Sequence, residues 1–235
     1  MEALTGYIFR NVYNRYFGDA DRYFTPFIAS RKLNSKEKND VLPEHNQNMD
    51  VIPQILTNKS EEFCYIASRL KEYYGYEEVN LNLGCPSGTV VAKNRGSGFL
   101  AVPDELNRFF EEVFSRTDVR ISVKTRTGVE NNENWENILK IYNDYPISEL
   151  IIHPRCRKDG YGGKPNLEDF KKAVLISRHS LCYNGDINSV EDYNAITKEF
   201  PTVDKIMCGR GILMSPGLVS VITGGSKASG ERLYY

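Results

Sequence analysis

The sequence predicts an α/β fold, a (β/α)8 TIM barrel without its first strand, and three observations support this class. Short apolar, β-branched runs alternate with helical stretches, which is typical of βαβ units and a parallel sheet. The chain has 235 residues, just under the ~250 of a typical barrel. The first predicted helix precedes the first predicted strand, as it would in a barrel that lacks its opening strand. An open doubly wound sheet is the alternative.

Seven strands are predicted from runs rich in apolar and β-branched residues. They cover Tyr23–Ile28, Val51–Leu56, Glu78–Leu83, Val119–Lys124, Glu149–His153, Ser180–Asn184 and Asp204–Cys208. Apolar periodicity and capping residues predict helices as well. These helices cover Tyr7–Phe17, Ser60–Tyr74, Pro103–Phe114 and a segment from Asn188 or Ser189 to Ile196. The polar stretch Ser30–Asp50 is predicted to be a loop.

Composition excludes several classes of protein. A hydrophobic content of 40% with 26% charged residues is ordinary for a globular protein and argues against disorder. Thirty basic and 31 acidic residues give a net charge of −1, which excludes nucleic-acid binding by bulk charge but leaves a local basic patch open. No apolar run approaches the ~18 residues of a membrane span. The five cysteines form no C-x-x-C pair, so a reducing cytoplasm is the predicted location and no metal site is expected.

Polar side chains stand at the carboxyl ends of six successive predicted strands. In chain order they include Gln54, Asn82, Cys85, Lys124, Arg126, His153, Arg155, Asn184, Asp186, Cys208 and Arg210. In a (β/α) barrel these ends face one mouth, where the active site lies. Packing alone does not explain such a succession of amide, thiol, ammonium, guanidinium and imidazole groups. We therefore expect the site at this mouth.

Cys85 is the candidate catalytic residue. It lies between Gly84 and Pro86 in a turn after a strand, and a stretch rich in glycine and serine follows it. A thiol on such a loop suits either a nucleophile or a proton donor. An ordinary cysteine, with a pKa of ~8.5, is mostly protonated at neutral pH and can donate a proton without activation. A nucleophile would need nearby cations.

Several of these residues also have a structural interpretation. A lysine at a strand end is usually solvated, but alternation along its strand predicts that the stem of Lys124 lies inside the mouth. His153 follows three apolar residues and is as readily a hydrogen-bonded structural histidine. Cys156, between two arginines in a predicted mobile loop, is a candidate for a lowered pKa. The remaining cysteines are expected to be inert buried thiols: Cys64, Cys182 and Cys208.

Glycines and an arginine follow the last two predicted strands, in Asn184-Gly185-Asp186 and Gly209-Arg210-Gly211. Barrels commonly bind phosphate at this place through backbone N–H groups. Glycine allows close approach of the backbone, and arginine supplies charge and a planar fork. Ordinary glycine-containing turns are the alternative. Without a P-loop or a G-x-G-x-x-G motif, nucleotide hydrolysis and a Rossmann site lose support.

Taken together, the motifs resemble those of the tRNA-dihydrouridine synthase family of flavoproteins. The matching segments, in the family's order, are LTGYIFRN, PQIL, NLNLGCPSGTVVAKNRGSGFL, VKTRTG, IIHPRCRKDGYGG, YNGDI and MCGRGI. The resemblance implies a barrel that holds one FMN across its mouth and reduces uridine in tRNA to 5,6-dihydrouridine. It implies hydride transfer from the flavin to C6 of the uracil and a proton from Cys85 to C5, with NADPH as the reductant.

The resemblance also assigns roles position by position. The residues it places at the flavin are Gln54, Lys124, His153, Asn184, Gly185, Asp186, Gly209 and Arg210. Those it places at the substrate are Asn82, Lys93, Arg95, Arg126 and Arg155. Alternatively, the basic residues among them lie on a solvated loop surface and do not contact the substrate.

The same resemblance concerns the extent of the domain. Residues 1–235 would form an FMN-binding catalytic barrel domain that is incomplete, because the opening strand and a C-terminal helical tRNA-binding domain are absent. We expect this protein to be a monomer that binds tRNA and NADPH. Two alternatives stay open: an FMN-dependent reductase or dehydrogenase of free pyrimidines, and a non-catalytic RNA-binding remnant.

Overall fold

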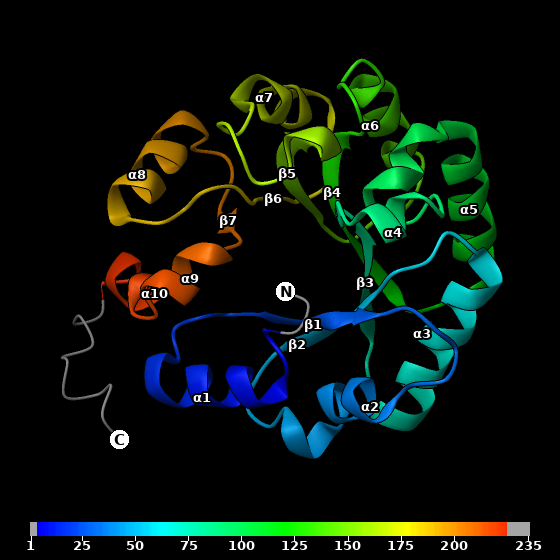
Figure 1. Cartoon of the computed structure of the whole chain (residues 1–235), viewed down its shortest axis with the longest axis horizontal. Coiled ribbons are helices and arrows are strands. Elements are labelled where there is room, and N and C mark those ends of the chain that lie inside the picture. The colour runs from blue at the N-terminus through cyan, green and yellow to red at the C-terminus, as the bar shows by residue number, and fades with distance from the viewer. Residues whose placement is uncertain (1–3, 225–235) are drawn as a thin grey trace.

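A computed structural model describes residues 4–224, which form a parallel sheet curled into a ring with helices around its outside (Figure 1). The strands pair in chain order, each parallel to the next. They are β1 (Tyr23–Ile28), β2 (Val51–Ile55), β3 (Glu78–Leu83), β4 (Arg120–Gly128), β5 (Leu150–Cys156), β6 (Leu181–Tyr183) and β7 (Lys205–Ile206). This is the arrangement of a (β/α) barrel, in which a closed sheet has eight strands. The described residues supply seven.

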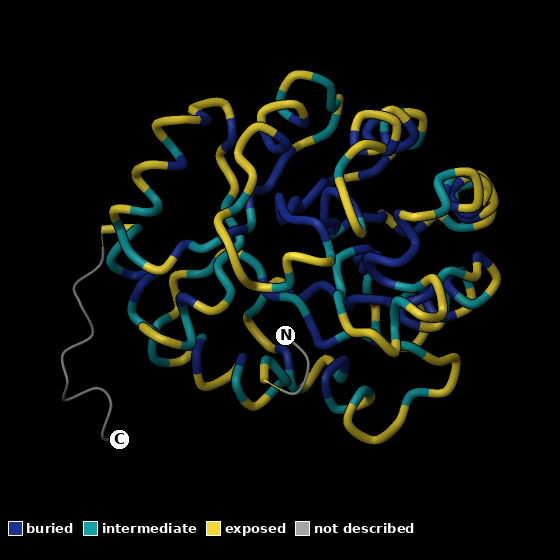
Figure 2. Tube along the Cα trace, turned by 45° about the horizontal axis from the view of Figure 1, so that its top comes forward, coloured by how far each residue is buried: buried dark blue, intermediate teal, exposed yellow. Residues whose placement is uncertain are grey.

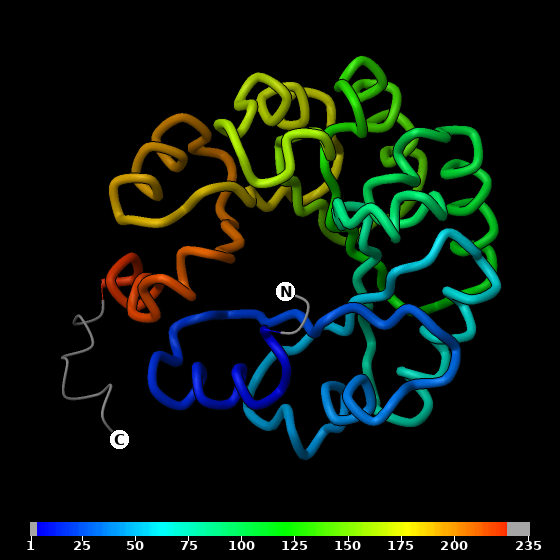
Figure 3. The backbone as a smooth tube through the Cα atoms, in the orientation of Figure 1, coloured from blue at the N-terminus to red at the C-terminus, as the bar shows by residue number. Residues whose placement is uncertain are grey.

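Helices connect the strands and surround the sheet, as the trace in Figure 3 shows. The α-helices are α1 (Tyr7–Phe17), α2 (Ser35–Val41), α3 (Ser60–Tyr74), α4 (Gly88–Val91), α5 (Pro103–Arg116), α6 (Trp135–Asn143), α7 (Leu167–Ile176), α8 (Val190–Glu199), α9 (Arg210–Met214) and α10 (Leu218–Ile222). Short 3-10 helices cover Pro43–His45, Gly96–Ala101 and Arg157–Asp159. No helix within residues 4–224 has the length and apolar character needed to cross a lipid bilayer.

An aromatic cluster brings the two ends of the ring together. Tyr13 of α1, Tyr23 of β1 and Val51 of β2 are buried against one another, and Ile212 of α9 packs on them. Helix α9, which follows β7, therefore packs on the cluster that α1, β1 and β2 form, and Figure 1 shows α9 and α1 on the same side of the ring. The ring is closed on this side by side-chain packing among the described residues.

The hydrophobic core lies between the sheet and its helices. Leu81, Val123 and Ile152, from three adjacent strands, are fully buried in one cluster with Phe63 of α3 and Phe110 of α5. Figure 2 shows the result, a buried inner trace with exposed residues on the outer faces of the helices. Because side chains alternate along a strand, the residues between these apolar positions point to the inside of the ring.

Polar side chains line that inner face. The strand register places Gln54, Asn80 and Ser122 in one row and Asn82 and Lys124 in the next. Paired residues of parallel strands lie on the same face, so alternation along β4 turns Lys124 inward, as predicted. The apolar core thus positions an inner surface that is available for polar contacts.

The structure differs from prediction in the stretch Ser30–Asp50, which contains helix α2. Asn34 accepts hydrogen bonds from the backbone N–H of Glu37, and the Glu37 carboxylate accepts from the N–H of Asn34 at 2.9 Å. This capping box starts a helix in a segment that has little apolar periodicity. The loop prediction was wrong because the polar composition concealed a capping signal.

Strands β4 and β5 also extend beyond their predicted ends. β4 continues to Gly128 and β5 to Cys156, so Arg126 and Arg155 are strand residues. The predicted mobile loop at Cys156 is wrong as well, since this residue is buried at the end of β5. The additional pairing fixes the direction in which both arginines leave the sheet.

The core predicts a large effect of truncation at Phe110. This side chain is fully buried and packs edge-on against Tyr142 and Phe109. We expect Phe110→Ala to lower the free energy of unfolding by about 3–5 kcal/mol, because it leaves a cavity in a close-packed core. Urea unfolding measures this change. Leu175→Ala, at a side chain that is 78% exposed, is the control and should change stability by less than about 0.5 kcal/mol.

Candidate active site at the barrel mouth

A chain of hydrogen-bonded amides crosses the inner face of the sheet and ends at Cys85. Asn80 Nδ2 donates to Ser122 Oγ at 3.0 Å, and Gln54 Nε2 donates to Asn80 Oδ1 at 2.9 Å. Asn82 Nδ2 donates to Gln54 Oε1 at 2.6 Å, and Asn82 Oδ1 accepts the backbone N–H of Cys85 at 2.9 Å. Each amide in the chain uses both its oxygen and its nitrogen. Their orientations are therefore fixed by the network.

Cys85 begins a loop whose two ends are joined. Its carbonyl oxygen accepts from the Ser97 backbone N–H at 3.1 Å and from Ser97 Oγ at 2.8 Å. Gly96 has a φ of +56°, and a Cβ there would lie 2.8 Å from the Cys85 oxygen. Only glycine fits this close approach. The Cys85 residue itself is half-buried, so the turn holds its thiol at the edge of the mouth.

Lys124 lies beside the Cys85 turn. Its Nζ is 4.0 Å from the position that a Cβ on Gly84 would take, and its charge acts on Cys85. Burial and the neighbouring charge of Arg126 lower the pKa of Lys124 to about 8. No atom within residues 4–224 accepts a hydrogen bond from this ammonium group. A partly desolvated cation without such a partner suits a site that binds a polar or anionic ligand.

His153 is held in its neutral form. Arg155 Nη1 lies 3.2 Å from His153 Nε2, and because a guanidinium group only donates, Nε2 accepts and the ring proton is on Nδ1. Burial and the positive charges of Lys124 and two arginines lower the pKa of His153 to about 3. A hydrogen bond to the backbone of Asn184 opposes this lowering of the pKa and is outweighed. The imidazole is therefore a fixed neutral group at the mouth.

Arg126 binds backbone carbonyl groups on two sides of the mouth. Its guanidinium donates to Gly84 O at 3.0 Å, Cys156 O at 2.9 Å and Gly160 O at 2.7 Å. The guanidinium also lies 5.7 Å from the centre of the Tyr161 ring. Only 2% of the residue is exposed. The structure thus joins the Cys85 turn to the loop after β5 through Arg126.

Arg155 and Arg210 share the carboxylate of Asp186. Arg155 donates to Gly162 O at 3.1 Å and Gly163 O at 2.5 Å and forms an ion pair with Asp186. Arg210 Nη2 lies 2.6 Å from Asp186 Oδ1. The hydrogen bond from Arg155 and the charge of Arg210 lower the pKa of the Asp186 carboxyl. An ionised carboxylate repels phosphate, so this geometry suits Asp186 to orient arginines.

The glycines of the predicted phosphate site differ in their surroundings. A Cβ on Gly185 would lie 2.9 Å from the Tyr183 hydroxyl, whereas a Cβ on Gly209 would have no atom within 4 Å. Asn184 Nδ2 donates to Met207 O at 2.8 Å, which joins the ends of β6 and β7. The backbone at Gly209 is therefore open to a ligand beside Arg210.

Lys93 and Arg95, both predicted to contact the substrate, differ in their surroundings. Lys93 is exposed, and its carbonyl accepts from Asn58 Nδ2 at 3.1 Å. Arg95 forms an ion pair with Glu62 at 3.1 Å. Its guanidinium is engaged within the protein, whereas the ammonium of Lys93 faces solvent.

Burial raises the thiol pKa of the cysteines predicted to be inert. This holds for Cys64, for Cys182 and for Cys208, whose pKa rises to about 11. Burial also raises the pKa of the Cys156 thiol. The predicted lowering at Cys156 was wrong because its sulfur is withdrawn from solvent, while Arg155 binds carbonyl groups and a carboxylate.

Two residues of the site had escaped the sequence analysis. Asn80 and Ser122 complete the amide chain, and both are fully buried. Asn80 lies two residues before Asn82, so strand alternation was the signal that places both on one face. Ser122 stands two residues before Lys124 on β4 in the same way.

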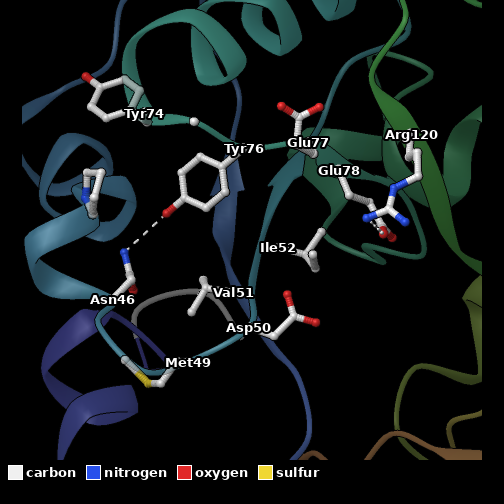
Figure 4. Close-up of a pocket in the computed structure, with 12 residues that line it drawn as sticks. Asn46, Met49, Asp50, Val51, Ile52, Tyr74, Tyr76, Glu77, Glu78 and Arg120 are labelled. Atoms are coloured by element: carbon white, nitrogen blue, oxygen red, sulfur yellow. Dashed lines mark hydrogen bonds and ion pairs between the residues drawn. The ribbon is translucent and has the colours of Figure 1, made fainter.

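A cavity of about 310 Å³ lies at the opposite end of the sheet (Figure 4). It is lined by the amino ends of β2, β3 and β4, including Asp50, Glu78 and Arg120. Glu78 pairs there with Arg22 at 3.2 Å and with Arg120 at 3.7 Å. These contacts stabilise the bottom of the barrel and lie away from the mouth. Residues 4–224 contain no group of three or more His, Cys, Asp or Glu side chains that could hold a metal ion.

Comparison with known proteins identifies the family. Residues 1–231 match the family model described as Dihydrouridine synthase (Dus). The chain belongs to the dihydrouridine synthase family. It is 27% identical to tRNA-dihydrouridine synthase B of Pasteurella multocida over 94% of this chain and 67% of that protein. It is 28% identical to the probable tRNA-dihydrouridine synthase 1 of Synechocystis over 94% of this chain and 62% of that protein.

Solved structures of similar fold agree with the barrel. A variant of NCR from Zymomonas mobilis superimposes with a TM-score of 0.60 at 14% identity, over 95% of this chain and 84% of that chain. Morphinone reductase gives a TM-score of 0.60 at 12% identity, over 96% of this chain and 83% of that chain. At such identities the likeness concerns the fold alone. The predicted (β/α)8 class is confirmed.

The buried neutral His153 predicts a dependence of stability on pH. An unfolded histidine takes up a proton below pH ~6.5, whereas the folded one does not until near its lowered pKa. The contribution of the neutral His153 to the free energy of unfolding is therefore complete above pH ~6.5 and is lost as the pH falls below that value. Between pH ~7 and ~5 we expect the wild type to lose about 2 kcal/mol more than His153→Gln in urea unfolding. Equal losses in the two proteins would show that His153 is protonated in the folded state.

Proposed function

We propose that this chain carries the catalytic site of a flavin-dependent enzyme that reduces uridine in tRNA to 5,6-dihydrouridine. Membership in the dihydrouridine synthase family supports the reaction, and the chain's similarity to tRNA-dihydrouridine synthases supports tRNA as the substrate. The observation that carries the proposal is a half-buried thiol, Cys85, on a fixed turn beside the ammonium group of Lys124, which has no hydrogen-bond partner within residues 4–224.

The residues at the mouth fit FMN. Lys124 offers a positive charge without a hydrogen-bond partner among the described residues, and Arg210 stands beside the open backbone of Gly209. These groups match a flavin ring that gains negative charge on reduction and a phosphate. We propose that the group is held by Gln54, Lys124, His153, Asn184, Gly185, Gly209 and Arg210, with Asp186 orienting Arg210. When bound and reduced, FMN would supply the hydride that adds to C6 of the uracil ring.

Cys85 is placed to supply the proton. Reduction of the C5=C6 bond adds a hydride at C6 and a proton at C5, and a thiol at the mouth can give the latter as a general acid. The hydrogen bond from its backbone N–H to Asn82 Oδ1, 2.9 Å long, keeps the turn in place. The ammonium group of Lys124 lies beside the turn on which the resulting thiolate would form. The thiolate regains a proton from water before the next turnover.

Features of the rim support an RNA substrate over a free base. Lys93, Lys158 and Tyr161 are exposed there, and basic and aromatic side chains are the groups that bind phosphates and bases. A uridine in folded RNA must leave its stack to enter the mouth, at a cost of about a few kcal/mol that such contacts offset. NADPH is the reductant that we propose, by analogy with the family. A reductase of free pyrimidines would have no use for this rim.

An in vitro assay tests the proposed function. The full chain is incubated with FMN, NADPH and tRNA that lacks dihydrouridine, and in parallel with uridine monophosphate. We expect dihydrouridine in the digested tRNA by mass spectrometry and a much slower reaction with the mononucleotide, because the rim contacts are lost. Faster reduction of the mononucleotide would favour the free-pyrimidine alternative. Binding of tRNA without any reduction would favour the RNA-binding remnant.

The two half-reactions separate the role of Cys85 from that of the flavin site. Cys85→Ala should leave reduction of the flavin by NADPH largely intact, because the thiol acts only on the uracil. Reduction of tRNA should be slower by about 10²-fold or more in single-turnover measurements. Cys64→Ala, which removes another half-buried thiol on α3, is the control and should retain both rates. An equal loss of both half-reactions in Cys85→Ala would indicate a structural role.

A further inference from the structure

The loop between Cys85 and Ser97 has few attachments beyond its own joined ends. Arg95 makes most of them: Nη2 lies 3.1 Å from Glu62 Oε2, and Nε and Nη1 donate to Asn58 Oδ1 at 3.4 Å and Ala29 O at 3.5 Å. Asn58 returns a hydrogen bond to the carbonyl of residue 93 at 3.1 Å. Three neighbouring segments thus hold the loop at one point.

The acceptor for Arg95 is itself held in place. Glu62 accepts a hydrogen bond from the buried hydroxyl of Thr57, whose oxygen accepts the backbone N–H of Lys59 at 3.1 Å. The Arg95 and Glu62 side chains are only 19% and 16% exposed. Partial shielding from water makes such a pair stronger than an exposed surface pair. The pair is also kept in one geometry by its hydrogen bonds to fixed groups.

The attachment at Arg95 is coupled to Cys85 through the next two residues. Gly96 packs so closely that a Cβ there would lie 2.9 Å from the Cys85 Cβ, and Ser97 holds the Cys85 carbonyl. Asn94 and Gly96, on either side of Arg95, both have positive φ, at 51° and 56°. The backbone path at Arg95 is therefore tightly defined, and a shift there moves the residues that contact Cys85.

From this geometry we infer that Arg95 is a positioning residue: with Glu62 it forms a latch that holds the Cys85 loop in its catalytic position. In this role Arg95 acts through the loop and not on the substrate itself. This role replaces the substrate contact expected from the sequence, since the guanidinium is directed toward α3 and the loop before it. The inference rests on the proposed function only for what Cys85 does during turnover.

The accessibility of the Cys85 thiol tests the latch in the absence of any substrate. The full chain is treated with iodoacetamide, and alkylation of the Cys85 peptide is followed by mass spectrometry. Labelling of a partly protected group follows the population of the open state. We expect Arg95→Gln and Glu62→Gln to raise the rate by about tenfold, a shift of about 1.4 kcal/mol in the closing equilibrium. Arg95→Lys keeps the positive charge but loses the planar guanidinium group. Its alkylation rate should lie between those of these two variants and that of the wild type.

Glu61→Gln is the matched control. Glu61 is the neighbour of Glu62 on α3, its side chain is 74% exposed, and it lies 3.7 Å from Arg31. In the Glu61→Gln variant, Cys85 should be alkylated at the wild-type rate. An unchanged rate in both Arg95→Gln and Glu62→Gln, or an equal increase in the control, would overturn the latch.

Steady-state kinetics with tRNA add a readout that distinguishes a latch from a substrate contact. Loss of the latch should lower kcat more than it raises KM, because fewer molecules hold the thiol in position. Loss of a uniform binding contact would raise KM alone, and this result in Arg95→Gln would contradict the inference. If the wild type does not reduce tRNA, the proposed function fails, but the alkylation rates still decide whether the latch exists.

Discussion

The hydrogen-bonded chain from Ser122 to the Cys85 turn is the constraint on which the site depends. Its members lie on the inner face of the sheet, where a buried polar group that loses its partner costs about 1–3 kcal/mol. Gln54 stands between Asn80 and Asn82 and bonds both. Each amide therefore holds its neighbours in one orientation. The turn that carries the thiol is positioned by the sheet, the most rigid part of the molecule, as well as by its own loop.

Positive charge is concentrated at the mouth although the chain carries a net charge of only −1. Lys124, Arg126, Arg155 and Arg210 gather there, and Asp186 is the carboxylate that pairs with two of them. Backbone carbonyl dipoles compensate the buried guanidinium groups, and they do so without neutralising their charge. The local potential therefore favours anions. A flavin phosphate and an RNA backbone are both anionic, so one distribution of charge serves both proposed ligands.

The sequence predicted the order and positions of the seven strands well because parallel strands leave a strong apolar pattern. Cys85, Lys124 and His153 were placed at one mouth by this reasoning alone. The extensions of β4 and β5 were not predicted, since Arg126 and Arg155 are charged residues of a kind that is typical of loops. The targets of these arginines could not be predicted either. A guanidinium on a long stem can reach solvent, a carboxylate or a carbonyl group, and the tertiary structure decides among them.

Two loops border the mouth, the loop after β5 and the Cys85 loop. They are held by different kinds of contact. The loop after β5 is held by buried arginines through carbonyl hydrogen bonds of 2.5–3.1 Å. The Cys85 loop is attached through Arg95 by contacts of 3.1–3.5 Å to groups that are partly exposed. Shorter, buried hydrogen bonds are stronger and less screened by water. The loop after β5 is therefore held more firmly than the Cys85 loop is at Arg95, and the part of the Cys85 loop that is anchored most strongly is the turn itself, through Asn82.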